Sequence, residues 1–115
     1  MLAEADTIIK TEEALVAAIT EAAQAKKPVN IIGAGTKAGL GRPFDPSATT
    51  VSTAGLSGVT LYEPAELVLS AKAGTTVAEI EKLLDSNNQM LAFEPPDYAR
   101  LLGTEPGKQT IGGVV

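Results

Sequence analysis

The sequence of 115 residues contains no histidine, no cysteine and no tryptophan, and aromatic residues make up only 3% of it. Without histidine, the chain has no Ser-His-Asp triad, no imidazole base and no imidazole metal ligand. Without cysteine, it has no thiol nucleophile, no disulfide and no thiolate ligand for zinc or an iron–sulfur cluster. Backbone amides, hydroxyls, carboxylates and a few lysines and arginines remain. We therefore predict no metal site and no thiol or imidazole catalysis in this chain, and we name no catalytic residue in it.

The charge balance is acidic, with 14 Asp and Glu against 9 Lys and Arg. Nucleic-acid binding requires clustered basic side chains, and Lys26 and Lys27 form the only local pair. No segment approaches the roughly 20 apolar residues of a membrane span, and the N-terminus lacks the basic region of a signal peptide. We therefore predict a cytoplasmic protein with no nucleic-acid partner and no transmembrane segment.

The length and the hydrophobic pattern predict one domain over residues 1–115, of class α/β (α+β), with two helices covering a small mixed sheet. One helix follows Thr11, carries an apolar stripe that includes Leu15 and Ile19, and ends before Pro28. A second helix begins at Thr76, which forms a capping box with Glu79. Both apolar stripes are expected in the core. Strands are expected at residues 29–32, 50–52, 59–62, 67–73 and 90–93.

A glycine-rich loop directly follows the strand predicted at residues 29–32, with glycines at positions 33, 35, 39 and 41. Glycines in such a place let successive backbone N–H groups converge on one point, and that arrangement binds phosphate oxygens. Thr36 adds a hydroxyl and Lys37 adds a positive charge. The spacing fits neither the Walker pattern nor the dinucleotide pattern Gly-x-Gly-x-x-Gly. From composition alone, two interpretations stay open: a phosphate-binding cradle, or a tight surface turn with a solvated Lys37.

Six short segments occur in an order that resembles the N-terminal part of the PCMH-type FAD-binding domain of the vanillyl-alcohol-oxidase family, in particular its glycolate-oxidase-like members. The most specific segment is Gln-Met-Leu-Ala-Phe-Glu-Pro-Pro-Asp at residues 89–97. The others lie at residues 32–37, 39–43, 62–67, 73–75 and 110–113. One departure is Ala34, which stands where family members commonly have a third glycine. The resemblance covers almost the whole chain.

The resemblance implies a non-covalent FAD site. The first glycine loop would hold the pyrophosphate through its amides, the turn at residues 110–113 would line the cofactor, and the two prolines would lie near the flavin. The candidate cofactor-binding residues are Gly33, Ala34, Gly35, Thr36, Lys37, Gly39, Pro95, Pro96, Thr110, Ile111, Gly112 and Gly113. The family domain continues past the position of Gly113 into a second subdomain, so we expect this chain to be part of a longer polypeptide and inactive by itself.

The resemblance also implies oxidation of a 2-hydroxy acid, with flavoprotein and iron–sulfur subunits of an oxidase complex as partners. Such partners would hold a cytoplasmic protein at the inner membrane; a homo-oligomer is a further expectation. Two alternatives stay open. One is a non-catalytic subunit-interaction module that keeps the half-domain fold and pairs through the apolar end at Val114 and Val115 or through a sheet edge. The other is a phosphate-ligand binder unrelated to flavin.

Overall fold

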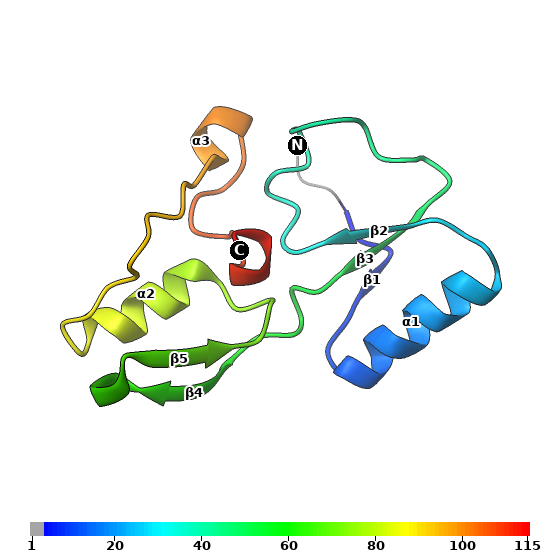
Figure 1. The fold of residues 1–115 in the computed structure, drawn as a ribbon. Helices are drawn as coiled ribbons and strands as arrows, with labels where there is room; N and C mark the ends of the chain where they lie inside the picture. Colours follow the sequence, from blue (N-terminus) through cyan, green and yellow to red (C-terminus); the bar gives the residue numbers. More distant parts are fainter. Residues whose placement is uncertain (1–3) are drawn as a thin grey trace.

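The computed structural model describes residues 4–115, which form two small lobes with separate sheets (Figure 1). The first lobe contains a three-stranded parallel sheet and one long helix. The second contains a two-stranded antiparallel sheet and a shorter helix. The C-terminal segment returns between the two lobes (Figure 1).

The first lobe has strand order β1-β3-β2, with β1 at Thr7–Ile8, β2 at Val29–Ile32 and β3 at Thr49–Ser52. The parallel register of β2 on β3 pairs Val29 with Thr49 and Ile32 with Ser52. Helix α1, Glu12–Gln24, connects β1 to β2. The buried core of this lobe is Ile9, Val51 and Leu56, and Leu15, Ala18 and Val29 pack against it partly buried.

Helix α1 begins as predicted, because the Thr11 side chain accepts a hydrogen bond of 3.1 Å from the Ala14 N–H. Its apolar stripe was expected in the core and is there only in part: Leu15 packs against the core while partly exposed. No residue of α1 is fully buried, and the side chain of Val16 is 65% exposed. The reason is the small sheet, since three short strands cannot cover the whole face of a 13-residue helix.

The second lobe contains β4 at Val59–Glu63, the 3-10 turn η1 at Pro64–Glu66, and β5 at Val68–Ala71. Helix α2, Val77–Asp85, has the predicted capping box between Thr76 and Glu79 and buries Val77, Ile80 and Leu84. The α/β class is confirmed, but the strands form two sheets instead of one mixed sheet. A turn at residues 53–58, in which the Leu56 N–H donates to Thr53 O at 2.9 Å, directs β4 away from β3.

The segment after α2 differs most from the prediction. Residues 90–93 were expected to form a strand, and this is wrong: they have no strand partner and line a cavity instead. The chain then forms a short helix α3, Ala99–Leu102, and a 3-10 turn η2, Ile111–Gly113. An antiparallel bridge joins Thr110 to Thr76, so the C-terminal turn is fixed to the start of α2. Neither α3 nor β1 was predicted.

Candidate functional site

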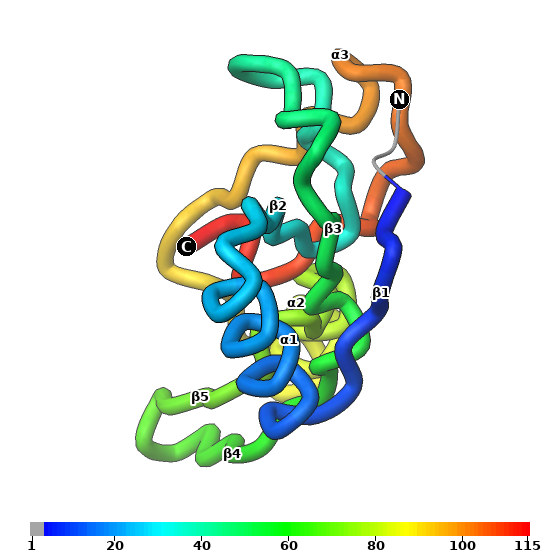
Figure 2. The backbone as a smooth tube through the Cα atoms, turned by 90° about the vertical axis from the view of Figure 1, so that its right-hand side faces the viewer, coloured from blue at the N-terminus to red at the C-terminus, as the bar shows by residue number. Residues whose placement is uncertain are grey.

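The glycine-rich loop is anchored where it leaves β2. The Ser52 hydroxyl at the end of β3 donates a hydrogen bond of 2.7 Å to the Gly33 carbonyl, and the Thr53 N–H donates to Ile32 O at 2.9 Å. The start of the loop therefore continues the parallel sheet with defined geometry. Figure 2 shows that the loop and α3 lie at the same end of the molecule.

The loop presents unpaired backbone donors. Within residues 4–115, the four successive N–H groups of residues 34–37 donate no hydrogen bond. Gly35 has φ 71°, a left-handed conformation that glycine adopts without strain, and both Gly35 and Thr36 are buried. Buried backbone N–H groups are almost always paired. Consecutive donors without a protein acceptor are the arrangement that binds an anion.

The turn at residues 110–113 packs directly against this loop. A Cβ placed on Gly33 would overlap Thr110 Oγ1, so the two segments approach closely only because residue 33 is glycine. Thr110 itself is 3% exposed. Gly112 has a different neighbour: its N–H donates to Ala73 O at 2.9 Å, and a Cβ there would come within 2.8 Å of the Ala73 Cβ. The lack of a side chain at residue 112 is therefore a packing requirement.

The loop and the turn enclose a cavity of about 190 Å³. Seven of the twelve predicted site residues line it. The structure therefore brings together most of the predicted phosphate-binding residues from two segments that lie far apart in the sequence. The residues that line the cavity are Ile31, Ile32, Gly33, Ala34, Gly35, Thr36, Lys37, Ala38, Phe44, Gln109, Thr110 and Gly113.

The remaining predicted site residues lie outside this cavity. Ile111 lines a larger apolar cavity, and Pro95 lines a shallow hollow beside α2. Three predicted residues line none of these three cavities: Gly39, Pro96 and Gly112.

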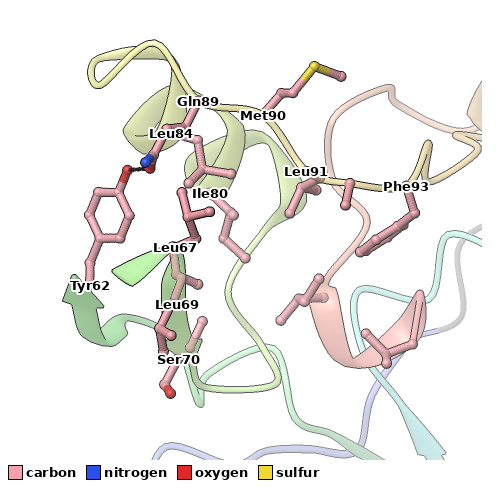
Figure 3. Close-up of a pocket in the computed structure, with 15 residues that line it drawn as sticks. Tyr62, Leu67, Leu69, Ser70, Ile80, Leu84, Gln89, Met90, Leu91 and Phe93 are labelled. Carbon is pink, nitrogen blue, oxygen red and sulfur yellow. Dashed lines mark hydrogen bonds between the residues drawn. The ribbon is translucent and has the colours of Figure 1, made fainter. Parts of the chain in front are cut away.

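The larger apolar cavity has a volume of about 780 Å³ and lies between β5, α2 and residues 89–93 (Figure 3). At one edge, the Tyr62 hydroxyl donates to Gln89 Oε1, and Gln89 Nε2 donates to Pro64 O at 2.8 Å. Leu67 and Met90 line the cavity although each is 81% exposed.

Lys37 connects the loop to its neighbours. Its Nζ donates a hydrogen bond of 3.1 Å to Gly113 O and lies 5.9 Å from the centroid of the Tyr98 ring. The charge of this side chain therefore lies at the junction of the loop and the C-terminal turn. A cation at this position would neutralise phosphate charge beside the unpaired amides.

Asp97 fixes the segment next to Lys37, as a side chain that orders a turn. One carboxylate oxygen accepts from the Gly107 N–H at 2.8 Å and the other accepts from the Ala99 N–H at 2.9 Å. These two bonds, the Gly107 bond first, and the nearby Lys37 charge lower the pKa of Asp97 below 3.8, against a small opposing effect of burial. Asp97 therefore orders the turn through its side chain.

Gln109 is the cavity residue that the sequence did not reveal. Its side chain is 6% exposed, and its Oε1 is buried without a hydrogen-bond partner among the residues that the structure describes. No motif marks this residue, because a glutamine before a Thr-Ile-Gly-Gly turn is unremarkable without knowledge of its burial. The cavity is therefore lined both by residues with unpaired backbone donors and by a residue with an unpaired acceptor.

Comparisons with known proteins are consistent with this geometry. The chain matches the family described as "FAD binding domain" over residues 3–115. The chain belongs to this FAD-binding family. It is also 37% identical over 103 residues to glycolate oxidase subunit GlcE of Escherichia coli (strain K12). The match covers 90% of this chain and 27% of that protein, so the chain spans about a quarter of the relative's length. The prediction of FAD as cofactor is confirmed.

Two further observations concern metals and membranes. Across residues 4–115, acidic side chains do not gather in threes at a place where a metal ion could sit. In the same part of the chain, no helix has the length and apolar character needed to cross a bilayer.

Proposed function

We propose that this chain supplies the pyrophosphate-binding part of a non-covalent FAD site in a glycolate-oxidase-like flavoprotein. The observation that carries the proposal is the set of four unpaired N–H groups at residues 34–37, since all four residues line one cavity and one of them is Lys37. The amides donate to phosphate oxygens and the lysine balances their charge. Membership of the FAD-binding family supports the identity of the ligand.

When bound, FAD supplies the electron acceptor for oxidation of the substrate. The relative's description as a glycolate oxidase subunit supports a 2-hydroxy acid as substrate and further oxidase subunits as partners. That these are flavoprotein and iron–sulfur subunits is part of the proposal. The chain lacks the side chains usually used to attach a flavin covalently, histidine and cysteine. Its own residues hold and orient the cofactor, and we propose that it is inactive alone. A cytoplasmic location, with the partners at the inner membrane, belongs to the same proposal.

The test follows the backbone N–H signals of the ¹⁵N-labelled chain by NMR during titration with FAD, because this measurement detects weak binding. We expect shifts concentrated at residues 34–37 and 110–113. Riboflavin carries no phosphate and should leave the loop signals in place. The proposal fails if FAD moves no loop signal, or if riboflavin moves the same signals as FAD does.

A matched pair of variants strengthens this test. Gly35 and Gly103 have nearly the same backbone conformation, with φ of 71° and 70°, but Gly103 follows α3 and does not line the cavity. Gly35→Ala should weaken FAD binding by about tenfold or more, since a strained φ displaces the amides from their positions. Gly103→Ala introduces the same strain and should leave FAD affinity unchanged. Equal losses in both variants would attribute the effect to global destabilisation and contradict the proposed role of the loop.

A second candidate function is a non-catalytic interaction module, favoured by the apolar cavity of about 780 Å³ and by the exposed Leu67 and Met90 on it. Large exposed apolar patches mark interaction sites. Size-exclusion chromatography with light scattering distinguishes the two functions. A chain that stays monomeric at high concentration and binds FAD contradicts the module, whereas stable association without FAD binding favours it.

A further inference from the structure

Gln109 carries the strongest unexplained feature of the site. Its side chain is almost completely buried, yet Oε1 finds no donor among residues 4–115. Buried side-chain oxygens without a partner are rare, because leaving water without a compensating hydrogen bond is costly. Gln109 lines the same cavity as the residues of the glycine-rich loop. A hydrogen-bond donor on a bound ligand would pair with Oε1 and so remove the free-energy cost of burying it unpaired.

The backbone on both sides of Gln109 is fixed. Its carbonyl accepts a hydrogen bond of 3.0 Å from the Val77 N–H at the start of α2, and the following residue, Thr110, is bridged to Thr76. The Ile111 N–H donates to Thr75 O at 2.8 Å. The main chain therefore cannot move toward a new donor without breaking the N-terminus of α2. Rotation of the Gln109 side chain is therefore the movement that can bring Oε1 to a donor in the cavity.

The chemistry of an amide oxygen restricts what it can meet in this cavity. Oε1 only accepts hydrogen bonds, and the phosphate oxygens of a pyrophosphate diester at neutral pH also only accept. Its partner must therefore carry a proton. FAD has hydroxyl groups on both sides of the pyrophosphate, on the ribityl chain and on the adenosine ribose. A hydroxyl next to the bound pyrophosphate meets the requirement.

We propose that Gln109 is a cofactor-binding residue whose Oε1 accepts a hydrogen bond from a sugar hydroxyl of FAD adjacent to the pyrophosphate. This inference rests on the proposed function of the loop. The loop amides recognise the phosphate charge, which many nucleotides share. Gln109 adds recognition of a sugar hydroxyl and so favours a nucleotide over a bare inorganic anion.

The first test compares Gln109→Leu with wild type in titrations with FAD and with inorganic pyrophosphate. We expect FAD affinity to fall by about three- to tenfold, the value of one hydrogen bond to a neutral group. Pyrophosphate affinity should stay the same, because inorganic pyrophosphate carries no sugar hydroxyl. Gln24→Leu makes the same change at the exposed end of α1 and should alter neither affinity. Equal FAD affinity of the Gln109→Leu variant and wild type would overturn the inference.

The second test needs no variant. The side-chain NH₂ signals of Gln109 in the ¹⁵N-labelled chain should shift on addition of FAD and stay in place with pyrophosphate. ADP and FMN then separate the two sugars: a shift with ADP assigns the ribose hydroxyl, and a shift with FMN assigns the ribityl hydroxyl. Unmoved Gln109 signals at FAD concentrations that shift the loop amides overturn this inference and leave the proposed function standing. Failure of FAD to move the loop amides overturns the proposed function itself.

Discussion

At the residue scale, the close approach of Gly33 to Thr110 holds the site together, because any side chain at residue 33 would meet Thr110 Oγ1. Gly33→Ala should lower the free energy of unfolding by about 1–3 kcal/mol, the usual cost of overpacking. Thr110→Ala removes the hydroxyl, so the double variant should recover part of this loss. Urea denaturation of both single variants and the double variant measures the coupling.

Gly39→Ala provides the control for this cycle. Its new Cβ would meet only Leu102 Cδ2 at 3.7 Å, an ordinary contact, and it should change stability by no more than about 0.5 kcal/mol. A Gly33→Ala loss that Thr110→Ala leaves untouched would show that the steric contact is not the cause.

Asp97 gives a prediction that depends on pH. The Gly107 and Ala99 N–H groups keep the pKa of Asp97 below 3.8 in the folded state. A lowered folded pKa stabilises the fold above the unfolded value, and this contribution disappears as pH falls through the folded value. Asp97→Asn should therefore cost about 0.5–1 kcal/mol at neutral pH, a modest value because the carboxylate is exposed. Thermal unfolding as a function of pH measures it, and a difference that persists well below pH 3.8 would contradict the charge-based explanation.

The site residues show what sequence reasoning can reach at this scale. The convergence of the loop residues Ala34 and Gly35 on one cavity was predictable, since glycines directly after a strand let successive backbone N–H groups approach one point. The role of Gln109 was not, because its signal is an unpaired oxygen in a buried position, and both facts depend on the packing of segments about 75 residues apart. Gly112 shows the opposite case, since a residue assigned to the cofactor by resemblance has a packing reason for being glycine.

At the element scale, the sequence predicted the features that depend on interactions between neighbouring residues, namely helix caps and one strand. The caps at Thr11 and Thr76 and the strand at Val29–Ile32 were correct because capping and strand patterns act over a few residues. The strand expected at residues 90–93 failed because a strand also needs a partner edge, and no sequence pattern shows whether one is free. The buried stripe expected for α1 failed for a similar reason, since the extent of the sheet determines how much of a helix it covers.

The two helix caps provide a prediction at this scale. Thr11→Ala removes one cap bond from α1, which buries no residue, whereas Thr76→Ala removes a capping box from α2, which buries Val77, Ile80 and Leu84. We expect losses in the free energy of unfolding of about 1 kcal/mol for Thr11→Ala and about 1–2 kcal/mol for Thr76→Ala. Urea denaturation of the two variants side by side measures the difference. An equal or larger loss for Thr11→Ala would show that α1 contributes more to stability than its burial indicates.

At the scale of the whole molecule, the chain is thin and open. It measures 48 × 34 × 16 Å, and its radius of gyration of 15.5 Å exceeds the roughly 13 Å of a compact domain of this length. Its accessible surface of 7819 Å² is about one third larger than the approximately 5,900 Å² expected for a compact protein of 11.8 kDa. Two lobes with one helix each leave the apolar cavity open along one side.

This openness should be measurable with an apolar dye. Anilinonaphthalene sulfonate should bind the folded chain in the cavity of about 780 Å³ and gain fluorescence without denaturant. Leu67→Lys places a charge at a residue that lines the cavity and should reduce the signal. Leu101→Lys changes a similarly exposed leucine on α3, outside the cavity, and should leave the signal unchanged. Equal dye fluorescence from Leu67→Lys and Leu101→Lys would mean that the dye binds outside this cavity. That result would contradict an open cavity in solution.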